Sequence, residues 1–282
     1  MSVRRTLLAV HAHPDDETIT MGGTLARYSA AGVRTVVVTC TTGDLGEVAP
    51  PTRLAAGETV ATLREAELRA ATARLGVSRL VQLGYGDSGM PGEPANARPG
   101  AFAGVPLDAA ATRLADVVRT ERPQVLIAYD ATGGYGHPDH IRAHQVANAA
   151  YALLDASDRP LKLYYVCFPL GWSRGFVAAL RAAGIDAPGS APAGADAGPG
   201  VTEIGVPDAT VTTVLDVRDY ARVKYAALAC HHSQMPPDHF LMRMSPELVA
   251  TQWAHEFFSR QAGPTDVHPG QTETDLFAGL DG

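Results

Sequence analysis

The chain has 282 residues, 46% of them hydrophobic, and a formal net charge of −7. A chain of this length can bury a full core without disulfide or metal staples. The acidic balance and the lack of any Lys/Arg run argue against nucleic acid as a partner. The three scattered cysteines, without C-x-x-C spacing, are typical of a reducing compartment. Since no apolar run has the length of a signal peptide or a membrane span, we expect a cytoplasmic protein that binds no membrane.

Short apolar runs alternate with helical patterns through the first 170 residues. The runs, each typical of a strand buried on both faces, are Thr6–Val10, Thr35–Thr39, Leu80–Leu83, Val125–Tyr129 and Leu161–Val166. Helices are predicted over Thr20–Ala31, Thr59–Leu75, Leu107–Glu121 and Pro138–Leu154. This alternation predicts an α/β, Rossmann-like three-layer fold with a mainly parallel sheet and helices on both of its faces.

The chain changes character after about residue 171, where a smaller α+β region is expected. Residues 186–200 are rich in Ala, Gly and Pro, which predicts a flexible surface loop. Two strands are predicted after it (Val201–Val206 and Thr210–Val217), then a helix over Arg218–His232, a helical stretch near Ser245–His255 and an irregular tail. We therefore predict a catalytic domain at 1–170 and a C-terminal region at 171–282 that completes the substrate pocket.

Two clusters of titratable residues interrupt this ordinary pattern. HAHPDDE at 11–17 begins where the first strand ends, and GGYGHPDHIRAH at 133–144 follows the fourth strand. In a right-handed parallel sheet both clusters lie at the carboxyl edge. The common strand order 3-2-1-4-5 would make strands one and four neighbours at the switch point, where open α/β sheets bind ligands. The two clusters are therefore expected to meet in one pocket.

The residue types in these clusters favour a divalent metal. No G-x-G-x-x-G motif follows the first strand and no Walker motif is present, whereas His13, Asp16 and one histidine of the second cluster offer three ligands. Three protein ligands leave a coordination position for water, which a catalytic metal makes nucleophilic near neutral pH. Asp15 would be the general base, and a second histidine would bind the oxyanion. Spacing alone leaves open which histidine binds the metal.

These motifs resemble the PIG-L/LmbE-like zinc N-deacetylases, which remove acetyl groups from amino sugars. The resemblance extends through TCTTGDLGEV, LREAELRAA, GDSGMPG, CHHSQ and ETDLFAGL and covers most of the chain. It is strongest to the branch of mycothiol metabolism, which contains the GlcNAc-inositol deacetylase and the mycothiol S-conjugate amidase. The resemblance implies a hydrolase that acts on a small acetylated amino-sugar substrate.

The resemblance also implies roles for individual residues. Zinc would be held by His13, Asp16 and His140, with Asp15 as the general base. His137 would stabilise the oxyanion and protonate the leaving amine, Asp139 would tune it, and Tyr135 would polarise the substrate carbonyl. The positions that would line the sugar pocket are Arg64, Glu47 and Asp87.

Several alternatives stay open at the level of the sequence. Thr20 stands where the conjugate amidases commonly carry a lysine, which favours a deacetylase, but GDSGMPGEPANARPGAF is amidase-like. The substrate could be a mycothiol precursor, a mycothiol conjugate or an N-acylated sugar on a secondary metabolite. Fe²⁺ accepts the same ligands as Zn²⁺, so an Fe(II) oxygenase is the second hypothesis and a non-catalytic binding module the third. The sequence does not decide whether the chain forms a homo-oligomer.

Each candidate residue also has an ordinary structural interpretation. Asp15 could be a helix N-cap, Arg64 a member of a solvated helix charge pair, and Glu47 and Asp87 turn formers. His144 is expected to pack under the site rather than to bind metal. Roles for His11, His231 and His232 are not assigned, although the loop that carries the last two, together with Gln234, could approach the pocket from the C-terminal region.

Overall fold

The computed structural model describes residues 5–186, 204–268 and 270–280. Within these residues one seven-stranded sheet has the order β3-β2-β1-β4-β5-β7-β6. The strands are β1 (Thr6–His11), β2 (Arg34–Thr41), β3 (Arg79–Tyr85), β4 (Val125–Tyr129), β5 (Lys162–Cys167), β6 (Thr213–Asp216) and β7 (His255–Ala262). β1 to β5 are parallel, whereas β7 is antiparallel to both of its neighbours. The mainly parallel sheet and the order of its first five strands are as predicted.

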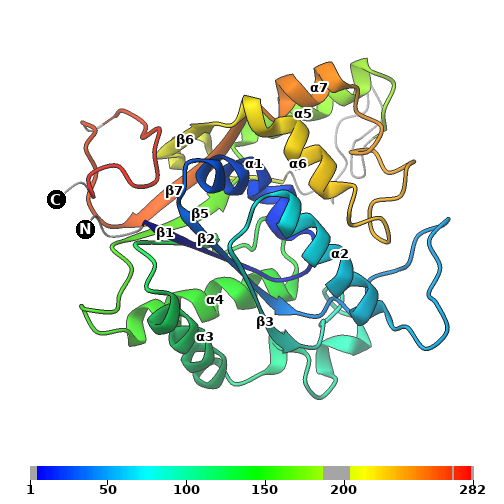
Figure 1. The fold of residues 1–282 in the computed structure, drawn as a ribbon, viewed down its shortest axis with the longest axis horizontal. Coiled ribbons are helices and arrows are strands. Elements are labelled where there is room, and N and C mark those ends of the chain that lie inside the picture. The colour runs from blue at the N-terminus through cyan, green and yellow to red at the C-terminus, as the bar shows by residue number, and fades with distance from the viewer. Residues whose placement is uncertain (1–4, 187–203, 269, 281–282) are drawn as a thin grey trace.

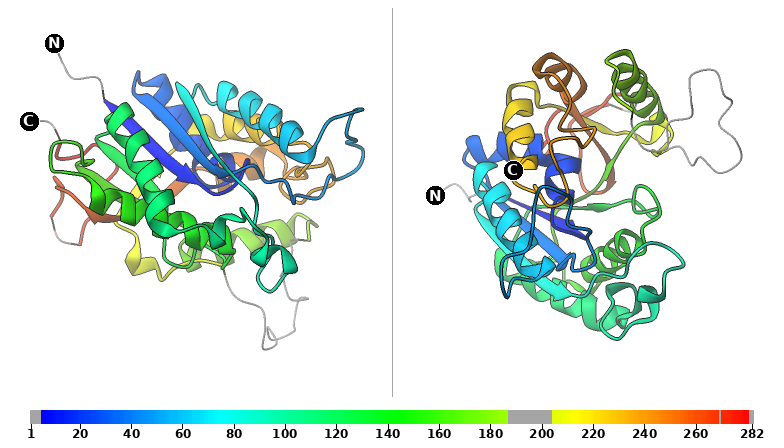
Figure 2. Two further views of the ribbon diagram at one scale, coloured as in Figure 1. Left: turned by 90° about the horizontal axis from the view of Figure 1, so that it is seen from below. Right: turned by 90° about the vertical axis from the view of Figure 1, so that its right-hand side faces the viewer.

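Helices cover both faces of this sheet. Those that the structure describes are α1 (Asp16–Ala30), α2 (Val60–Arg74), α3 (Leu107–Glu121), α4 (Pro138–Leu153), α5 (Leu170–Ala182), α6 (Ala221–Leu228) and α7 (Pro246–Gln252). α3 and α4 pack together on one face, and α1, α2 and α6 pack on the other (Figures 1 and 2). The predicted three-layer α/β fold is confirmed. None of the described helices combines the length and the apolar character needed to cross a bilayer.

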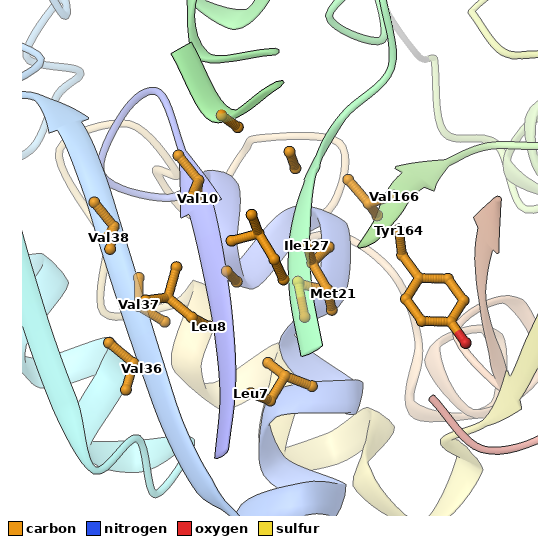
Figure 3. Packing of buried hydrophobic residues seen from close by; sticks show 14 of the residues in the cluster. Leu7, Leu8, Val10, Met21, Val36, Val37, Val38, Ile127, Tyr164 and Val166 are labelled. Atoms are coloured by element: carbon orange, nitrogen blue, oxygen red, sulfur yellow. The ribbon is translucent and has the colours of Figure 1, made fainter. Parts of the chain in front are cut away.

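The core lies between the central strands and the helices on either side. Every residue of β1 and β4 is buried, as expected for strands covered on both faces. Leu8 on β1, Val37 on β2 and Ile127 on β4 project into the packed interior together with Met21 of α1 (Figure 3). Burying a Val, Leu or Ile side chain contributes roughly 1.5–3 kcal/mol. This packing fixes the positions of the carboxyl ends of β1 and β4, where the two polar clusters begin.

α1 begins four residues earlier than predicted and is interrupted. Its first residue is Asp16 rather than Thr20, and the backbone leaves helical geometry at Met21 (φ −147°, ψ 27°). The carboxylate of Glu256 on β7 accepts hydrogen bonds from the backbone N–H groups of Gly23 (3.0 Å) and Thr24 (2.6 Å) just after this break. Glu256 therefore serves as a cap for the second part of α1, because N–H groups at a helix start have no partner within the helix.

The C-terminal region differs from the prediction in its elements. The predicted irregular tail contains β7, which lies between β5 and β6, and α5 has no counterpart among the predicted elements. The polar residues inside HEFFSRQA conceal the strand, because buried Glu256 and Ser259 break its apolar pattern. Of the predicted strand Val201–Val206, residues 201–203 lie outside the described part, and Val206 forms only an isolated bridge with Pro169.

The proposed boundary at residues 170/171 falls after the first residue of α5, and the chain beyond it rejoins the same sheet. β7 pairs with β5, from Leu163↔Ala262 to Cys167↔Phe257, so the C-terminal region extends the sheet of the first 170 residues. Apart from Asp186, the predicted loop at 186–200 lies outside the described residues.

Candidate metal centre and catalytic pocket

The two polar clusters meet at the carboxyl edge of the sheet, as predicted. β1 and β4 are direct neighbours, with Ala9 opposite Ile127, so the loops that follow them leave the sheet side by side. His13, Asp15 and Asp16 from the first loop line one pocket with His137 and His140 from the second. The pocket has a volume of about 390 Å³, within the range of about 300–1,000 Å³ typical of small-molecule sites.

Three donor atoms in this pocket are arranged as ligands of one metal ion. His13 Nδ1 lies 3.2 Å from His140 Nε2 and 3.4 Å from Asp16 Oδ2, and His140 Nε2 lies 3.3 Å from Asp16 Oδ2. Ligands bound at 2.0–2.1 Å to a tetrahedral ion are separated by roughly 3.3–3.4 Å. His13, Asp16 and His140 therefore fit one face of a tetrahedral zinc site, with a coordination position left for water or substrate.

The hydrogen bonds of both imidazoles direct their free nitrogens toward this cluster. His13 Nε2 lies 3.2 Å from Asp139 Oδ2, and His140 Nδ1 lies 3.1 Å from the carbonyl oxygen of Gly133. Each contact needs a proton on that nitrogen, so His13 Nδ1 and His140 Nε2 keep the lone pair that a metal requires. Asp139 is itself held by the backbone N–H of Ser88 (2.8 Å) and by the Ser88 hydroxyl.

Asp139 contacts a second histidine besides the one it was expected to tune. The resemblance implied that it tunes His137, and its carboxylate also contacts His13. Its backbone N–H donates to His137 Nδ1 (3.1 Å), which makes His137 the N-cap of α4. This bond leaves the proton of neutral His137 on Nε2, where it can be donated to a ligand. Burial, followed by the charges of His13 and His140, lowers the pKa of His137 to about 4.

A second combination of donors includes His137. Single atoms of His13, His137 and His140 lie within 4.8 Å of one another, as do atoms of His13, His137, Asp87 and Asp139. For these groupings 4.8 Å is an upper bound on the separations, whereas the three atoms of the triangle that includes Asp16 lie 3.2–3.4 Å apart, as tetrahedral ligands do. The geometry therefore favours Asp16 as the third ligand and leaves His137 beside the metal position.

Asp15 has an unusual backbone conformation, and its side chain does not cap the helix that follows it. Its φ of 105° and ψ of −31° belong to a region that side-chain-bearing residues rarely adopt, at a cost of roughly 1–3 kcal/mol. It stands at the N-cap position of α1, yet its side chain forms no capping hydrogen bond, so the ordinary N-cap interpretation does not hold. Burial raises its pKa to about 6, with Arg64 opposing and Asp16 adding to the shift. A carboxylate with this pKa suits proton transfer near neutral pH.

Arg64 and Asp87 line the pocket, but both are already engaged by protein groups. Arg64 is buried and donates to the carbonyl oxygens of Pro14 (2.6 Å) and Gly43 (2.9 Å), and its Nη2 lies 3.2 Å from Asp15 Oδ2. This contact pattern excludes a solvated helix charge pair. Asp87 Oδ1 accepts from Gly89 N–H (2.8 Å) and lies 3.7 Å from His13 Nε2. Although burial raises the pKa of Asp87, these contacts outweigh it and lower the pKa.

Of the two loop residues Tyr135 and Glu47, only Tyr135 lies in the pocket wall. Tyr135 lines the pocket, with its ring 4.9 Å from the ring of His140, and it is 48% exposed. It is flanked by glycines whose positive φ values only glycine adopts readily. Glu47 is exposed and absent from the pocket wall, and its backbone carbonyl accepts a hydrogen bond from Gln234, which does line the pocket. The structure therefore does not bring Glu47 together with the other predicted site residues.

The pocket wall contains further residues that were not assigned a role. They are Ile19, Thr20, Met90, Tyr129, Gly133, Gly134, Val166, Cys167, Phe168, Ile204 and Gln234. Tyr129 stacks on His140 at 4.5 Å, and Val166 and Cys167 end β5. Because β4 and β5 end at the same edge as β1, the position of these residues at the strand ends is the signal that could have found them. Gln234 confirms that its loop reaches the pocket.

Four further histidines lie outside the pocket wall. His144 Nδ1 lies 2.9 Å from the carbonyl oxygen of Tyr129, and it packs under the site as expected. His11 packs edge-to-face on Tyr129 with both ring nitrogens buried and unpartnered, and burial lowers its pKa to about 4. His232 is more than half exposed and lies 3.1 Å from Glu67. His231 is fully buried against Glu17.

This chain is similar to proteins that have an assigned function. A protein of Acidothermus cellulolyticus named 1D-myo-inositol 2-acetamido-2-deoxy-alpha-D-glucopyranoside deacetylase is 42% identical over 285 residues, which cover 98% of this chain and 96% of the relative. A protein of the same name from Geodermatophilus obscurus is 42% identical over the full length of both chains.

Solved structures share the fold at lower identity. The N,N'-diacetylchitobiose deacetylase of Pyrococcus horikoshii superposes with a TM-score of 0.60 at 21% identity, over 92% of this chain and 84% of its own. The 4-carboxy-2-hydroxymuconate hydratase GalB of Pseudomonas putida gives the same score at 22% identity, over 94% and 99%. Since one neighbour is a hydratase, the fold does not fix the reaction. Residues 8–151 match the family described as PIG-L: GlcNAc-PI de-N-acetylase. Together with relatives 42% identical along its whole length, this match shows that the chain belongs to the PIG-L de-N-acetylase family.

Proposed function

We propose that this chain is a metal-dependent N-deacetylase that releases acetate from an N-acetylated amino sugar, with GlcNAc-inositol as the substrate. The observation that carries the proposal is the triangle of His13, Asp16 and His140 donor atoms, 3.2–3.4 Å apart, with Asp15 in the same pocket. Two relatives 42% identical over nearly the whole chain bear the name of the GlcNAc-inositol deacetylase, which supports the substrate. Mycothiol S-conjugates and N-acylated sugars of secondary metabolites are the competing substrates.

His13, Asp16 and His140 would hold the metal, for which we propose zinc. Two imidazoles and one carboxylate at tetrahedral spacing suit Zn²⁺, although Fe²⁺ uses the same ligand types. When bound, zinc would acidify a water molecule and polarise the amide carbonyl of the substrate. Asp16 is suited to this role because the charges and hydrogen bonds of His140 and His13 outweigh burial and keep its pKa well below the usual value.

Asp15 would accept the proton of the attacking water. Its carboxylate lines the pocket and is not used for capping, so an oxygen atom is available to a water molecule at the metal position. Nη2 of Arg64 lies 3.2 Å from Oδ2 of the Asp15 carboxylate. We infer that Arg64 fixes the orientation of Asp15 rather than binding the sugar, because its guanidinium already donates to two backbone carbonyls.

His137 and Tyr135 would act on the carbonyl oxygen of the substrate. His137 Nδ1 is occupied by the N–H of Asp139, so its Nε2–H is the group that can donate to an oxyanion. The proton that Asp15 takes from the water would pass to the amine as the C–N bond breaks, because neutral His137 cannot give up its own proton without becoming an imidazolate. Tyr135 lies at the opening of the pocket on a glycine-flanked loop, and its phenol would donate to the carbonyl oxygen when a substrate is bound.

Acetate release from GlcNAc-inositol tests the proposal. Zinc-reconstituted protein is incubated with this compound, with N-acetylglucosamine or with a bulky mycothiol S-conjugate, and the new primary amine is quantified. We expect the highest kcat/KM for GlcNAc-inositol and no amine formation after chelation, with activity restored by Zn²⁺. A higher kcat/KM for the S-conjugate would make the chain an amidase. Amine formation that chelation does not affect would contradict the metal-dependent mechanism.

A further inference from the structure

A completely buried charge pair lies behind the catalytic pocket and has no part in the mechanism above. Glu17 in the first turn of α1 and His231 in the loop after α6 both have 0% of their side chain exposed. His231 Nε2 lies 3.0 Å from Glu17 Oε1. Neither residue belongs to the pocket wall. Burying two titratable groups is costly, and the two come from segments more than 200 residues apart. The packing of one helix does not explain why both are buried.

The second carboxylate oxygen of Glu17 is hydrogen-bonded to Asp15. Glu17 Oε2 accepts the backbone N–H of Asp15 at 3.0 Å. Asp15 has a φ of 105°, one of only two positive φ values at non-glycine residues in the described part of the chain. A backbone in this region persists only where its surroundings hold it. The Glu17 carboxylate is the group that binds the amide of this residue, so it resists the relaxation of Asp15 to an ordinary conformation.

Arg64 holds Asp15 from the other side. It donates to the carbonyl oxygen of Pro14, on the peptide that ends at the Asp15 amide, and its Nη2 lies 3.2 Å from the Asp15 carboxylate. The peptide between Pro14 and Asp15 is thus bound at its oxygen by Arg64 and at its nitrogen by Glu17. A change at either contact rotates this peptide plane and, with it, the direction of the Asp15 side chain.

We propose that Glu17 and His231 are positioning residues, which hold Asp15 in its left-handed backbone conformation so that its carboxylate faces the metal position. His231 acts through Glu17. By donating to Oε1, which also accepts from the Thr18 hydroxyl (2.5 Å), it fixes the carboxylate plane, which presents Oε2 to the Asp15 amide. The proposal rests on the role given to Asp15 above and extends the proposed site to a residue of the C-terminal region.

The matched pair His231→Gln and His231→Asn tests this role. The side-chain nitrogen of Gln can take the place of imidazole Nε2 and donate to Glu17, whereas that of Asn is one methylene too short. Loss of a group that orients a metal ligand typically costs about 10–100-fold in affinity or activity, and we expect the same order for a group that orients the neighbouring base. We expect kcat of H231N to fall by that factor with KM and zinc content unchanged, and kcat of H231Q to stay within about threefold of the parent.

Glu67→Gln is the control for a general disturbance of the same loop. Glu67 accepts from Ser233 N–H and from the Ser233 hydroxyl, both at 2.7 Å, and therefore anchors the loop of His231 without contacting Asp15. We expect its kcat to remain within about twofold of the parent. If H231N does not fold, Glu17→Asp shortens the same link from its other end and is expected to give the same loss of kcat.

Crystal structures of the zinc-loaded parent and of H231N give a readout that does not depend on activity. We expect Asp15 to lose its positive φ, or its carboxylate to turn from the metal position, in H231N alone. An unchanged Asp15 in H231N, or a kcat that falls only in proportion to the folded fraction or the zinc content, would overturn the proposal. A parent that hydrolyses none of the amides would refute the proposed function instead, while the two structures would still decide the positioning of Asp15.

Discussion

Asp15 and Asp16 are neighbours in the chain, yet their surroundings give them opposite properties. Burial raises the pKa of Asp15 to about 6, whereas His140 and His13 hold the pKa of Asp16 well below its ordinary range. The left-handed backbone at Asp15 separates the two side chains, so that one carboxylate contacts Arg64 and the other contacts the two histidines. A base and a metal ligand can therefore be built from consecutive residues.

Asp15→Asn removes the base and keeps the ligands. Loss of a general base typically costs about 10²–10⁴-fold. We expect kcat to fall by that factor while zinc content and the midpoint of thermal unfolding stay close to the parent. The matched control is Asp16→Asn, which should lose zinc as well as activity. If D15N keeps more than about a tenth of the parental kcat, Asp15 is not the base.

Asp139→Asn changes the hydrogen-bond partner of the proposed metal ligand His13 and leaves the ligand itself unchanged. The carboxylate of Asp139 accepts the proton of His13 Nε2, and an amide in its place holds the imidazole less well. Losing such a partner of a metal-bound histidine typically weakens metal binding by about 10–100-fold. We expect that increase in the zinc dissociation constant, measured by competition with a chromogenic chelator. An unchanged dissociation constant would mean that the His13–Asp139 contact has no part in metal binding.

At this scale the sequence predicted residue types better than their contacts. His13, Asp16 and His140 could be proposed because few roles require so many imidazoles and carboxylates at two strand ends. Glu47 was misplaced because its position depends on the path of a long loop, which no local pattern determines. The carboxylate contact of Asp139 with His13 depends on side-chain directions across two loops, and spacing along the chain does not contain them.

At the scale of single elements, the break in α1 lies against a buried ion pair between α6 and β7. Lys224 Nζ lies 2.7 Å from Glu256 Oε1, and both side chains are nearly inaccessible. Glu256 also binds the N–H groups of Gly23 and Thr24 after the break. One carboxylate therefore supports the second part of α1 and neutralises the ammonium group of α6.

Glu256→Gln should destabilise the protein by about 3–5 kcal/mol, because breaking a buried pair leaves the Lys224 charge without its partner. The free energy of unfolding is obtained from urea titrations of the zinc-free protein. Lys224→Met combined with Glu256→Gln removes both charges, and we expect it to recover most of the loss. If the double variant is as unstable as the single one, the hydrogen bonds of Glu256 to α1 contribute more than the ion pair.

The same pair explains why β7 could not be predicted. A strand is recognised from apolar residues at alternate positions, but HEFFSRQA places Glu256 and Ser259 in buried positions. Glu256 can be buried only because Lys224 and α1 satisfy it, and those partners lie 32 and more than 230 residues away. In β2 and β5 the buried polar residues Thr35, Thr39 and Lys162 flank the apolar runs rather than interrupt them, so these strands could be predicted.

At the scale of the whole molecule, a second buried polar cluster attaches the C-terminal segment to the sheet. Glu273 is 1% exposed and accepts from Lys162 Nζ (2.9 Å), the Tyr164 hydroxyl (2.7 Å) and the Thr213 hydroxyl (2.8 Å). Arg260 Nε lies 3.4 Å away. These partners come from β5, β6 and β7, so one carboxylate links three strands to the last part of the chain.

Glu273 also makes stability depend on pH in a defined direction. Burial raises its pKa, but the hydrogen bonds from Lys162, Tyr164 and Thr213 outweigh burial, and the net shift is below the ordinary value of 4.5. Since the folded state binds this proton more weakly than the unfolded state, the contribution of Glu273 is fully present above about pH 4.5. It is lost as the pH falls from there through the lower pKa of the folded state.

Glu273→Gln isolates this contribution from those of all other carboxylates. We expect the difference in the free energy of unfolding between the parent and E273Q to be about 3–5 kcal/mol at pH 7, because Lys162 keeps its charge without a partner. The difference should shrink as the pH is lowered below 4.5, since the parental carboxylate then becomes protonated as well. Urea titrations of both zinc-free proteins at several pH values measure it. A difference that stays constant down to acidic pH would show that Glu273 stabilises the sheet through its shape and neutral hydrogen bonds, and not through its charge.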